Sequence, residues 1–201
     1  MPKKYSPDWW RLESVIDSAQ YETIARCVRF VEHQIDEFDD RNQTQFSDEY
    51  GTLTQAAFLM ITVAQMEHHL QKVCDIIAEL RKLRVRPADL TGAKGFEQCI
   101  AYLTKVLQIA LPEKELTQIR AIVRIRNVWV HGGGYLDDVP QDLGPLRAHL
   151  GRNKDNQITF PGSFVQEACK LSGSLVQRVE ATVQGQGAQS ARGSKNKELA
   201  G

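Results

Sequence analysis

LMITVAQMEHHLQKVCDIIAEL, residues 59–80, is the most regular stretch of the chain and decides its fold. Apolar side chains recur in it at alternating steps of four and three residues, namely Leu59, Val63, Met66, Leu70, Val73, Ile77 and Leu80. This spacing lays one apolar stripe along a helix and is typical of the seam of a helical bundle or coiled coil. We therefore expect a long helix over residues 48–83 whose stripe packs against other helices.

Most of the remaining chain shows the same helical periodicity. Apolar residues recur at steps of three and four in four further segments, residues 8–38, 96–110, 112–131 and 163–183. The last of these opens with Ser163 and Gln166 in the capping-box spacing. The sequence therefore predicts an all-α fold, an antiparallel helical bundle of four to five main helices.

Two segments lack this periodicity. Residues 135–157 contain Pro140 and Pro145 and are expected to form a short irregular insertion before the last helix. Residues 185–201 are rich in Gly, Gln, Ser and Ala, which favours a flexible tail. We expect a single domain over residues 1–184.

The charge balance limits the classes of partner. Lys+Arg 25 against Asp+Glu 25 leaves no net charge, so any polyanion would have to be bound by a local patch. No apolar run approaches the roughly 20 residues that span a bilayer. Residues 1–7 lack the apolar segment of a secretory signal. These features predict a soluble, cytoplasmic protein that does not bind membranes.

The cysteines and the paired histidines do not suggest a metal site. The four cysteines are dispersed with no Cys-x-x-Cys pair, so we expect buried, reduced thiols at Cys27, Cys74, Cys99 and Cys169. His68 and His69 are adjacent on a helix and point about 100° apart, so they cannot easily share one ion. Neither a metal nor another cofactor is expected.

The candidate for chemistry is RNVWVHGGG, residues 126–134, at the end of the fourth expected helix. Arg126 falls within the apolar stripe of that helix, seven residues after Ile119 and four before Val130. A charge among core positions is unfavourable unless it is paired, so Arg126 requires a counterion or a functional cleft. Glu67, at the edge of the seam, is the candidate counterion. In a purely structural interpretation Arg126 only forms this salt bridge and His131 only complements the helix dipole.

A chemical interpretation is also open. Histidine can give or take a proton near neutral pH, and arginine offers a planar fork of donors for a phosphate. Together they suit metal-free phosphodiester chemistry on RNA, with His131 as acid or base, Arg126 stabilising charge on the phosphoryl oxygens, and Asn127 orienting either group. In a continuous helix these two residues would lie about 140° apart. We expect the glycines to end the helix at His131, so that its imidazole can turn toward Arg126 or toward a second subunit.

Residues 126–131 resemble the Arg-x-x-x-x-His signature of the HEPN superfamily (higher eukaryotes and prokaryotes nucleotide-binding), including the polar residue after the arginine, here Asn127. The helical pattern of residues 50–183 is similar to that family, but only the six-residue motif is specific. The resemblance implies an α-helical homodimer in which two Arg/His motifs share a cleft. It further implies, as in many members, a metal-independent endoribonuclease that leaves a 2′,3′-cyclic phosphate and acts as a toxin or in antiviral defence.

One departure from the family affects regulation. Members that are paired with a nucleotidyltransferase antitoxin resemble Arg-x-x-x-x-His-x-Tyr, in which the tyrosine is the modification acceptor. Here Gly133 occupies that position and the nearest tyrosine is Tyr135. Control by tyrosine adenylylation therefore does not carry over, although Tyr135 can still line the cleft.

Three interpretations of the function remain. The first is a dimeric HEPN-type ribonuclease whose RNA is bound by Arg120, Arg124 and Tyr135, with further cations in residues 81–86, and which an antitoxin or a defence complex controls. The second is a HEPN-like dimerisation module without catalysis that binds RNA, a nucleotide or a protein. A purely structural helical protein is the third alternative.

Overall fold

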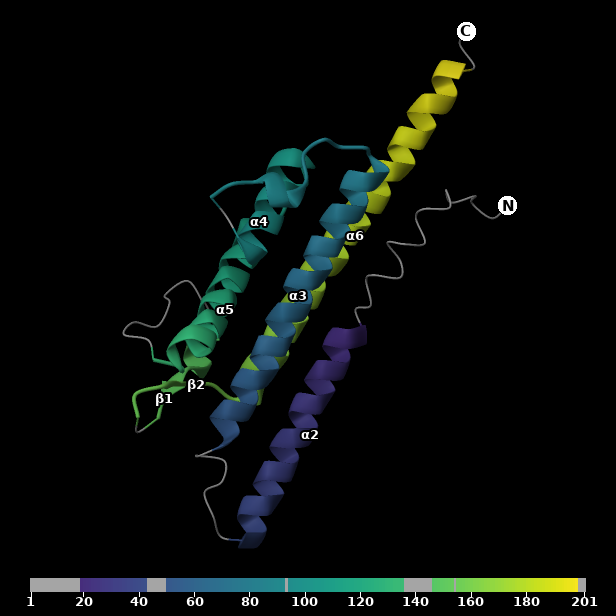
Figure 1. The fold of residues 1–201 in the computed structure, drawn as a ribbon. Coiled ribbons are helices and arrows are strands. Elements are labelled where there is room, and N and C mark those ends of the chain that lie inside the picture. The colour runs from purple at the N-terminus through teal and green to yellow at the C-terminus, as the bar shows by residue number, and fades with distance from the viewer. Residues whose placement is uncertain (1–18, 43–49, 93, 136–145, 154, 199–201) are drawn as a thin grey trace, which may run out of the picture. The chain divides into compact units, whose positions relative to one another are not determined.

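The computed structural model describes residues 19–42, 50–92, 94–135, 146–153 and 155–198, the side chains of 184–198 excepted. Five α-helices form most of it (Figure 1), and their bounds are α2 Ala19–Asn42, α3 Thr52–Leu80, α4 Gly95–Ala101, α5 Glu113–Gly132 and α6 Gly162–Glu198. Shorter elements are the 3₁₀-helix η2 Pro87–Asp89, the π-helix η3 Tyr102–Val106, and the strands β1 Gly151–Arg152 and β2 Ile158–Thr159. The prediction of an all-α helical bundle is confirmed.

The chain divides into two compact units. Among the described residues, the first unit consists of His69–Ala110 and the part of α6 that starts at Ser174, and the second consists of residues 19–68 and Leu111–Gly173. Helices α3 and α6 each continue from one unit into the other. The single domain predicted for residues 1–184 stays a prediction. All residues of the candidate site belong to the second unit.

The seam of α3 is buried as the periodicity predicts. Every member from Leu59 to Ile77 has at most 2% of its surface exposed. In the second unit α3 packs against α6, where the Thr62 hydroxyl and the Cys169 thiol lie 3.3 Å apart. Burial raises the pKa of Cys169, so this thiol stays protonated in the core at neutral pH.

Helix α2 runs antiparallel to the first turns of α6. Tyr21 near its start lies against Gly173, while Arg29 and Glu32 further along reach residues nearer the start of α6. The Glu32 carboxylate accepts a 2.6 Å hydrogen bond from the backbone N–H of Gly162. A negative charge is favourable there because the first N–H groups of a helix lack intrahelical acceptors. A Cβ at Gly162 would overlap that carboxylate, so a larger residue there would require the Glu32 side chain to move.

Several boundaries differ from the sequence predictions. The first helix is described from Ala19 to Asn42, so residues 8–18 lie outside the described part of the chain, and α3 is slightly shorter than predicted. Helix α6 continues to Glu198, beyond the point near residue 184 where the apolar pattern ends. Cys27 is exposed, so the expectation of four buried thiols is wrong at that position. It lies in α2, where Val28 is fully buried and its neighbours face outward.

The first unit contains the third predicted helix in a modified form. Helix α4 passes directly into η3, and the N–H of Leu107 donates to the carbonyl of Tyr102. The Tyr102 ring is fully buried and its hydroxyl donates a 2.9 Å hydrogen bond to the carbonyl of Val85. No helix in the described part of the chain combines the length and apolar character needed to cross a membrane.

Candidate active site

Helix α5 carries the candidate motif, and local sequence sets both of its ends. Pro112 is its N-cap, and Glu113 and Glu115 lie in the first turn, where negative charge complements the helix dipole. At the other end Gly133 adopts the left-handed conformation with φ 61°, and its N–H donates to the carbonyl of Val128. Glycine adopts this conformation without the steric cost that a Cβ brings, which makes it the usual residue after a helix.

Glycine is also required at the next position, Gly134, for a different reason. Its φ is 88°, and an added Cβ would lie 2.7 Å from the indole ring of Trp129. No side chain fits at that distance, so the chain leaves the helix by passing directly over the indole. Phe160 also packs against Trp129, and the two rings meet edge to face with their centroids 6.4 Å apart.

The small hairpin of β1 and β2 fixes the glycine segment from outside. The N–H of Ile158 donates to the carbonyl of Gly134 at 2.9 Å, and the side-chain amide of Gln157 donates to the carbonyl of Gly133 at 2.8 Å. Tyr135 and Gln157 form an isolated antiparallel bridge. The end of α5 is therefore held by a segment more than 20 residues further along the chain.

The ion pair expected from the sequence is present. One Nη of Arg126 donates to a carboxylate oxygen of Glu67 at 2.5 Å, joining α5 to α3. The two side chains are 16% and 26% exposed, so the pair lies at the edge of the core and still reaches solvent. The Nε of Arg126 is buried and has no hydrogen-bond partner within the described residues. The guanidinium is thus held in one orientation with part of its donor capacity unused.

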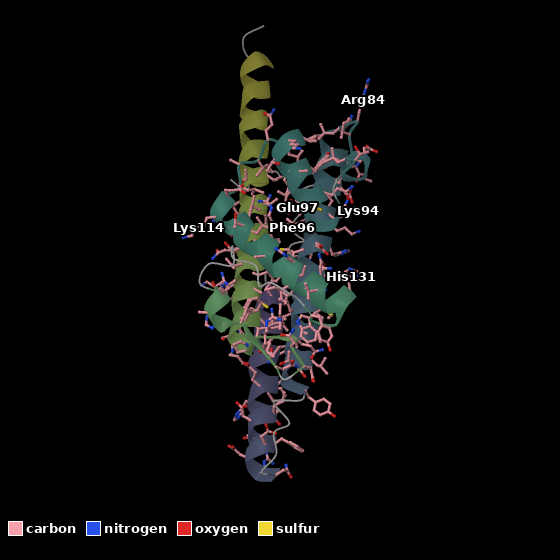
Figure 2. All side chains as sticks on the ribbon, turned by 90° about the vertical axis from the view of Figure 1, so that its left-hand side faces the viewer. Arg84, Lys94, Phe96, Glu97, Lys114 and His131 are labelled. Carbon is pink, nitrogen blue, oxygen red and sulfur yellow. The ribbon has the colours of Figure 1, made fainter. Side chains whose placement is uncertain are left out.

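His131 lies in the last turn of α5 and is exposed (Figure 2). The prediction that the helix ends at this residue is wrong, because α5 includes both His131 and Gly132. In a continuous helix, residues five positions apart differ by about 140° around the axis and about 7.5 Å along it. The side chains of Arg126 and His131 therefore leave the helix in different directions within one chain. Asn127, next to Arg126, is also exposed.

The three residues predicted to bind substrate have different surroundings. Arg120 is ion-paired with Glu113 at 2.7 Å, which partly neutralises its charge. Arg124 is exposed on the same helix. The Tyr135 side chain is 57% exposed, immediately after the glycines. The structure thus keeps Arg124 and Tyr135 accessible, while Arg120 is engaged within α5.

An exposed apolar stripe adjoins the ion pair on α3. Its apolar residues recur at steps of three and four along the helix. They are Leu53, which is 54% exposed, Ala57, Ile61, which is 47% exposed, and Ala64, and the exposed His68 follows at the same spacing. On α5, Val130 is 47% exposed and lies one turn after Arg126. Contiguous exposed apolar side chains are typical of contact surfaces.

The residues that hold the site carry no signal in the sequence. Gln157, Phe160 and the contact between Gly134 and Trp129 connect segments that only folding brings together. The described residues contain no group of three or more His, Cys, Asp and Glu side chains that could hold a metal ion.

In comparisons with known proteins, the chain matches no family model, no curated protein and no solved structure.

Proposed function

We propose that this protein is a metal-independent endoribonuclease of the HEPN type, acting on RNA in the cytoplasm as a toxin or in antiviral defence under the control of an antitoxin or defence complex. The observation that carries the proposal is the motif geometry in the second unit. Arg126 is held at the edge of the core by Glu67, and the exposed His131 follows at a helix end fixed by glycines and a hairpin.

The proposed reaction is attack of a ribose 2′-hydroxyl on the adjacent phosphorus. The 2′-oxygen forms a bond to phosphorus while the bond to the 5′-oxygen breaks. One His131 accepts the proton of the 2′-hydroxyl, and a second His131 gives a proton to the leaving 5′-oxygen. The products are a 2′,3′-cyclic phosphate and a 5′-hydroxyl. Arg126 stabilises the negative charge that grows on the phosphoryl oxygens, and Asn127 orients the phosphate or the imidazole.

A homodimer is part of this proposal because the motif of one chain is incomplete. Arg126 and His131 diverge on one helix, so a second copy has to supply the complementary group. The exposed aliphatic residues Leu53 and Ile61 on α3 and Val130 on α5 give such a dimer an apolar contact surface. Glu67 then acts as a positioning residue, because its carboxylate fixes the direction of the guanidinium.

The test is cleavage of single-stranded RNA by the purified full chain in excess chelator. Arg126→Ala and His131→Ala should each lower the rate by at least about 100-fold, the effect of removing a positioned acid, base or charge stabiliser. His33→Ala removes another exposed histidine of the same unit and should leave the rate unchanged. Cleavage that requires an added divalent ion overturns the metal-free mechanism.

A second candidate function is a non-catalytic module that binds RNA, a nucleotide or a protein. The observation that favours it is the engagement of Arg126 by Glu67, which neutralises the guanidinium before any phosphate arrives. In that case wild-type protein should bind RNA without cleaving it. Glu67→Gln should then tighten RNA binding by freeing the guanidinium, whereas a positioning role of Glu67 predicts a loss of cleavage.

A further inference from the structure

A cluster of cations follows α3 in the first unit. We call Arg81, Lys82, Arg84 and Arg86 the basic turn. All four are exposed, and Arg84 extends away from the ribbon (Figure 2). The whole chain carries no net charge, so four cations within six residues form a strong local excess.

The backbone of the basic turn is unusual at Lys82. Two backbone hydrogen bonds end helix α3. The N–H of Leu83 donates to the carbonyl of Ala78 at 2.8 Å, and the N–H of Lys82 donates to the backbone carbonyl of Glu79 at 3.0 Å. In this type of helix end the left-handed position is usually glycine. Here Lys82 occupies it with φ 51°, at a cost of about 1 kcal/mol relative to glycine. A charged residue in a strained conformation suggests that the charge itself is used.

Three hydrogen bonds hold the turn in place. The hydroxyl of the fully buried Tyr102 donates a hydrogen bond to the carbonyl of Val85, which lies between Arg84 and Arg86. The N–H of Arg86 donates to a carboxylate oxygen of Asp89 at 2.7 Å, and an Nη of Arg86 donates to the carbonyl of Asp75 at 3.4 Å. The backbone that carries the cations is therefore preorganised, which lowers the entropic cost of binding.

Two cations of the turn, Lys82 and Arg84, carry the argument that follows because they are exposed. Within the described part of the chain, neither Lys82 nor Arg84 forms an ion pair. The next acid after the turn, Asp89, directs its carboxylate at the backbone N–H of Arg86. Charge that is left exposed on a fixed backbone is suited to a polyanion.

We propose that the basic turn binds the phosphate backbone of single-stranded RNA, as a second contact for the substrate of the proposed ribonuclease, on which this inference rests. Three of its four cations are arginines, whose guanidinium forks match phosphate geometry. The turn offers no aromatic side chain for stacking, so it should bind RNA without regard to sequence. An anionic membrane is a poorer match, because Val85 is the turn's one exposed large apolar side chain and membrane surfaces are bound by extended apolar faces.

The test measures binding of a fluorescein-labelled 2′-O-methyl RNA 20-mer to the full chain by fluorescence anisotropy over a range of salt concentrations. This RNA lacks the attacking 2′-hydroxyl, so binding is read independently of cleavage. In Lys82→Gly/Arg84→Gln, loss of two phosphate contacts should weaken binding about 25-fold at 0.1 M salt and reduce the slope of log K against log salt by about 1.4. Lys82→Gly also relieves the backbone strain, so the variant should fold.

The control, Lys72→Gln/Lys105→Gln, removes two exposed cations of the same unit outside the turn and should change affinity less than about threefold. Equal losses in both double variants, or no binding by wild type, overturn the proposal. Cosedimentation with phosphatidylcholine vesicles containing phosphatidylserine, without RNA binding, assigns the turn to a membrane instead. If cleavage is insensitive to His131→Ala while the RNA affinity still depends on the turn, the proposed ribonuclease site fails and the RNA-binding surface stands.

Discussion

The C-terminal ends of α3 and α5 reach the same backbone geometry with different residues. After α3, Lys82 has φ 51°, and after α5, Gly133 has φ 61°. At the end of α5 the following Gly134 passes within contact of Trp129, which leaves no space for a side chain. At the end of α3 the side chains extend into solvent, and the chain uses cations there.

The difference shows that capping alone does not determine the residue. Both ends need one left-handed residue to satisfy the last carbonyls, and glycine would be the cheapest at each. Packing against the indole requires glycine at position 134 after α5, whereas after α3 a lysine occupies the left-handed position and its side chain is exposed. The comparison therefore predicts that substitutions at Gly134 act through packing, whereas substitutions at Gly133 and Lys82 act through the backbone conformation.

The largest effect is expected for Trp129→Ala. Removing the indole leaves a cavity beneath Gly134 and beside Phe160, and should lower the free energy of unfolding by about 4 kcal/mol, measured by urea denaturation. Trp129→Phe retains an aromatic ring and removes the buried indole N–H, which has no partner among the described residues, so it should cost less than half as much. A loss below about 1 kcal/mol for the alanine variant would show that the indole does not hold this helix end.

Gly134→Ala should follow in size. The added Cβ meets the indole at 2.7 Å and the residue has φ 88°, so strain and overlap together should lower stability by about 3 kcal/mol in the same assay. Combining it with Trp129→Ala tests the cause. The double variant should lose less than the sum of the single losses, because the clash disappears with the ring.

Exchanging the residue types at the two left-handed positions, Gly133 and Lys82, should change stability by a smaller amount. The sign should be opposite at the two helix ends. Gly133→Lys should cost about 1 kcal/mol, since its Cβ would find only an ordinary 3.7 Å contact with Tyr135 and only the conformational term remains. Lys82→Gly should raise stability by about the same amount. Destabilisation by Lys82→Gly would mean that the lysine side chain stabilises the fold, which would weaken its assignment to a partner.

The smallest effect is expected for Gly132→Ala, the third glycine of the motif. Gly132 lies within α5, and an added Cβ meets nothing within 4 Å. Alanine should therefore raise the free energy of unfolding by about 0.5 kcal/mol, measured as a slightly higher melting temperature. The glycine series should therefore change sign from Gly134 to Gly132. A uniform loss at all three positions would contradict the distinction between packing and backbone effects.

Much of the candidate site could be predicted from the sequence. Arg126 stands out as a charge within an apolar stripe, and Glu67 lies at the edge of the α3 seam, so their ion pair was a reasonable expectation and is confirmed. The position of the helix end could not be fixed to the residue. Three glycines in succession allow the left-handed cap at any of them, and the contact of Gly134 with Trp129 selects Gly133. That shift keeps His131 inside the helix and separates it from Arg126.

The sequence by itself determined the helices and their buried faces, because a 3.6-residue period is a local property that each segment carries independently. Tertiary structure alone decided how the motif is held. Gln157 and Phe160 reach the end of α5 across more than 20 residues of chain, and Glu67 reaches Arg126 across 59. Such contacts depend on how whole elements pack, since side-chain distances between separate segments are set by the shared core and leave no periodic trace in the sequence.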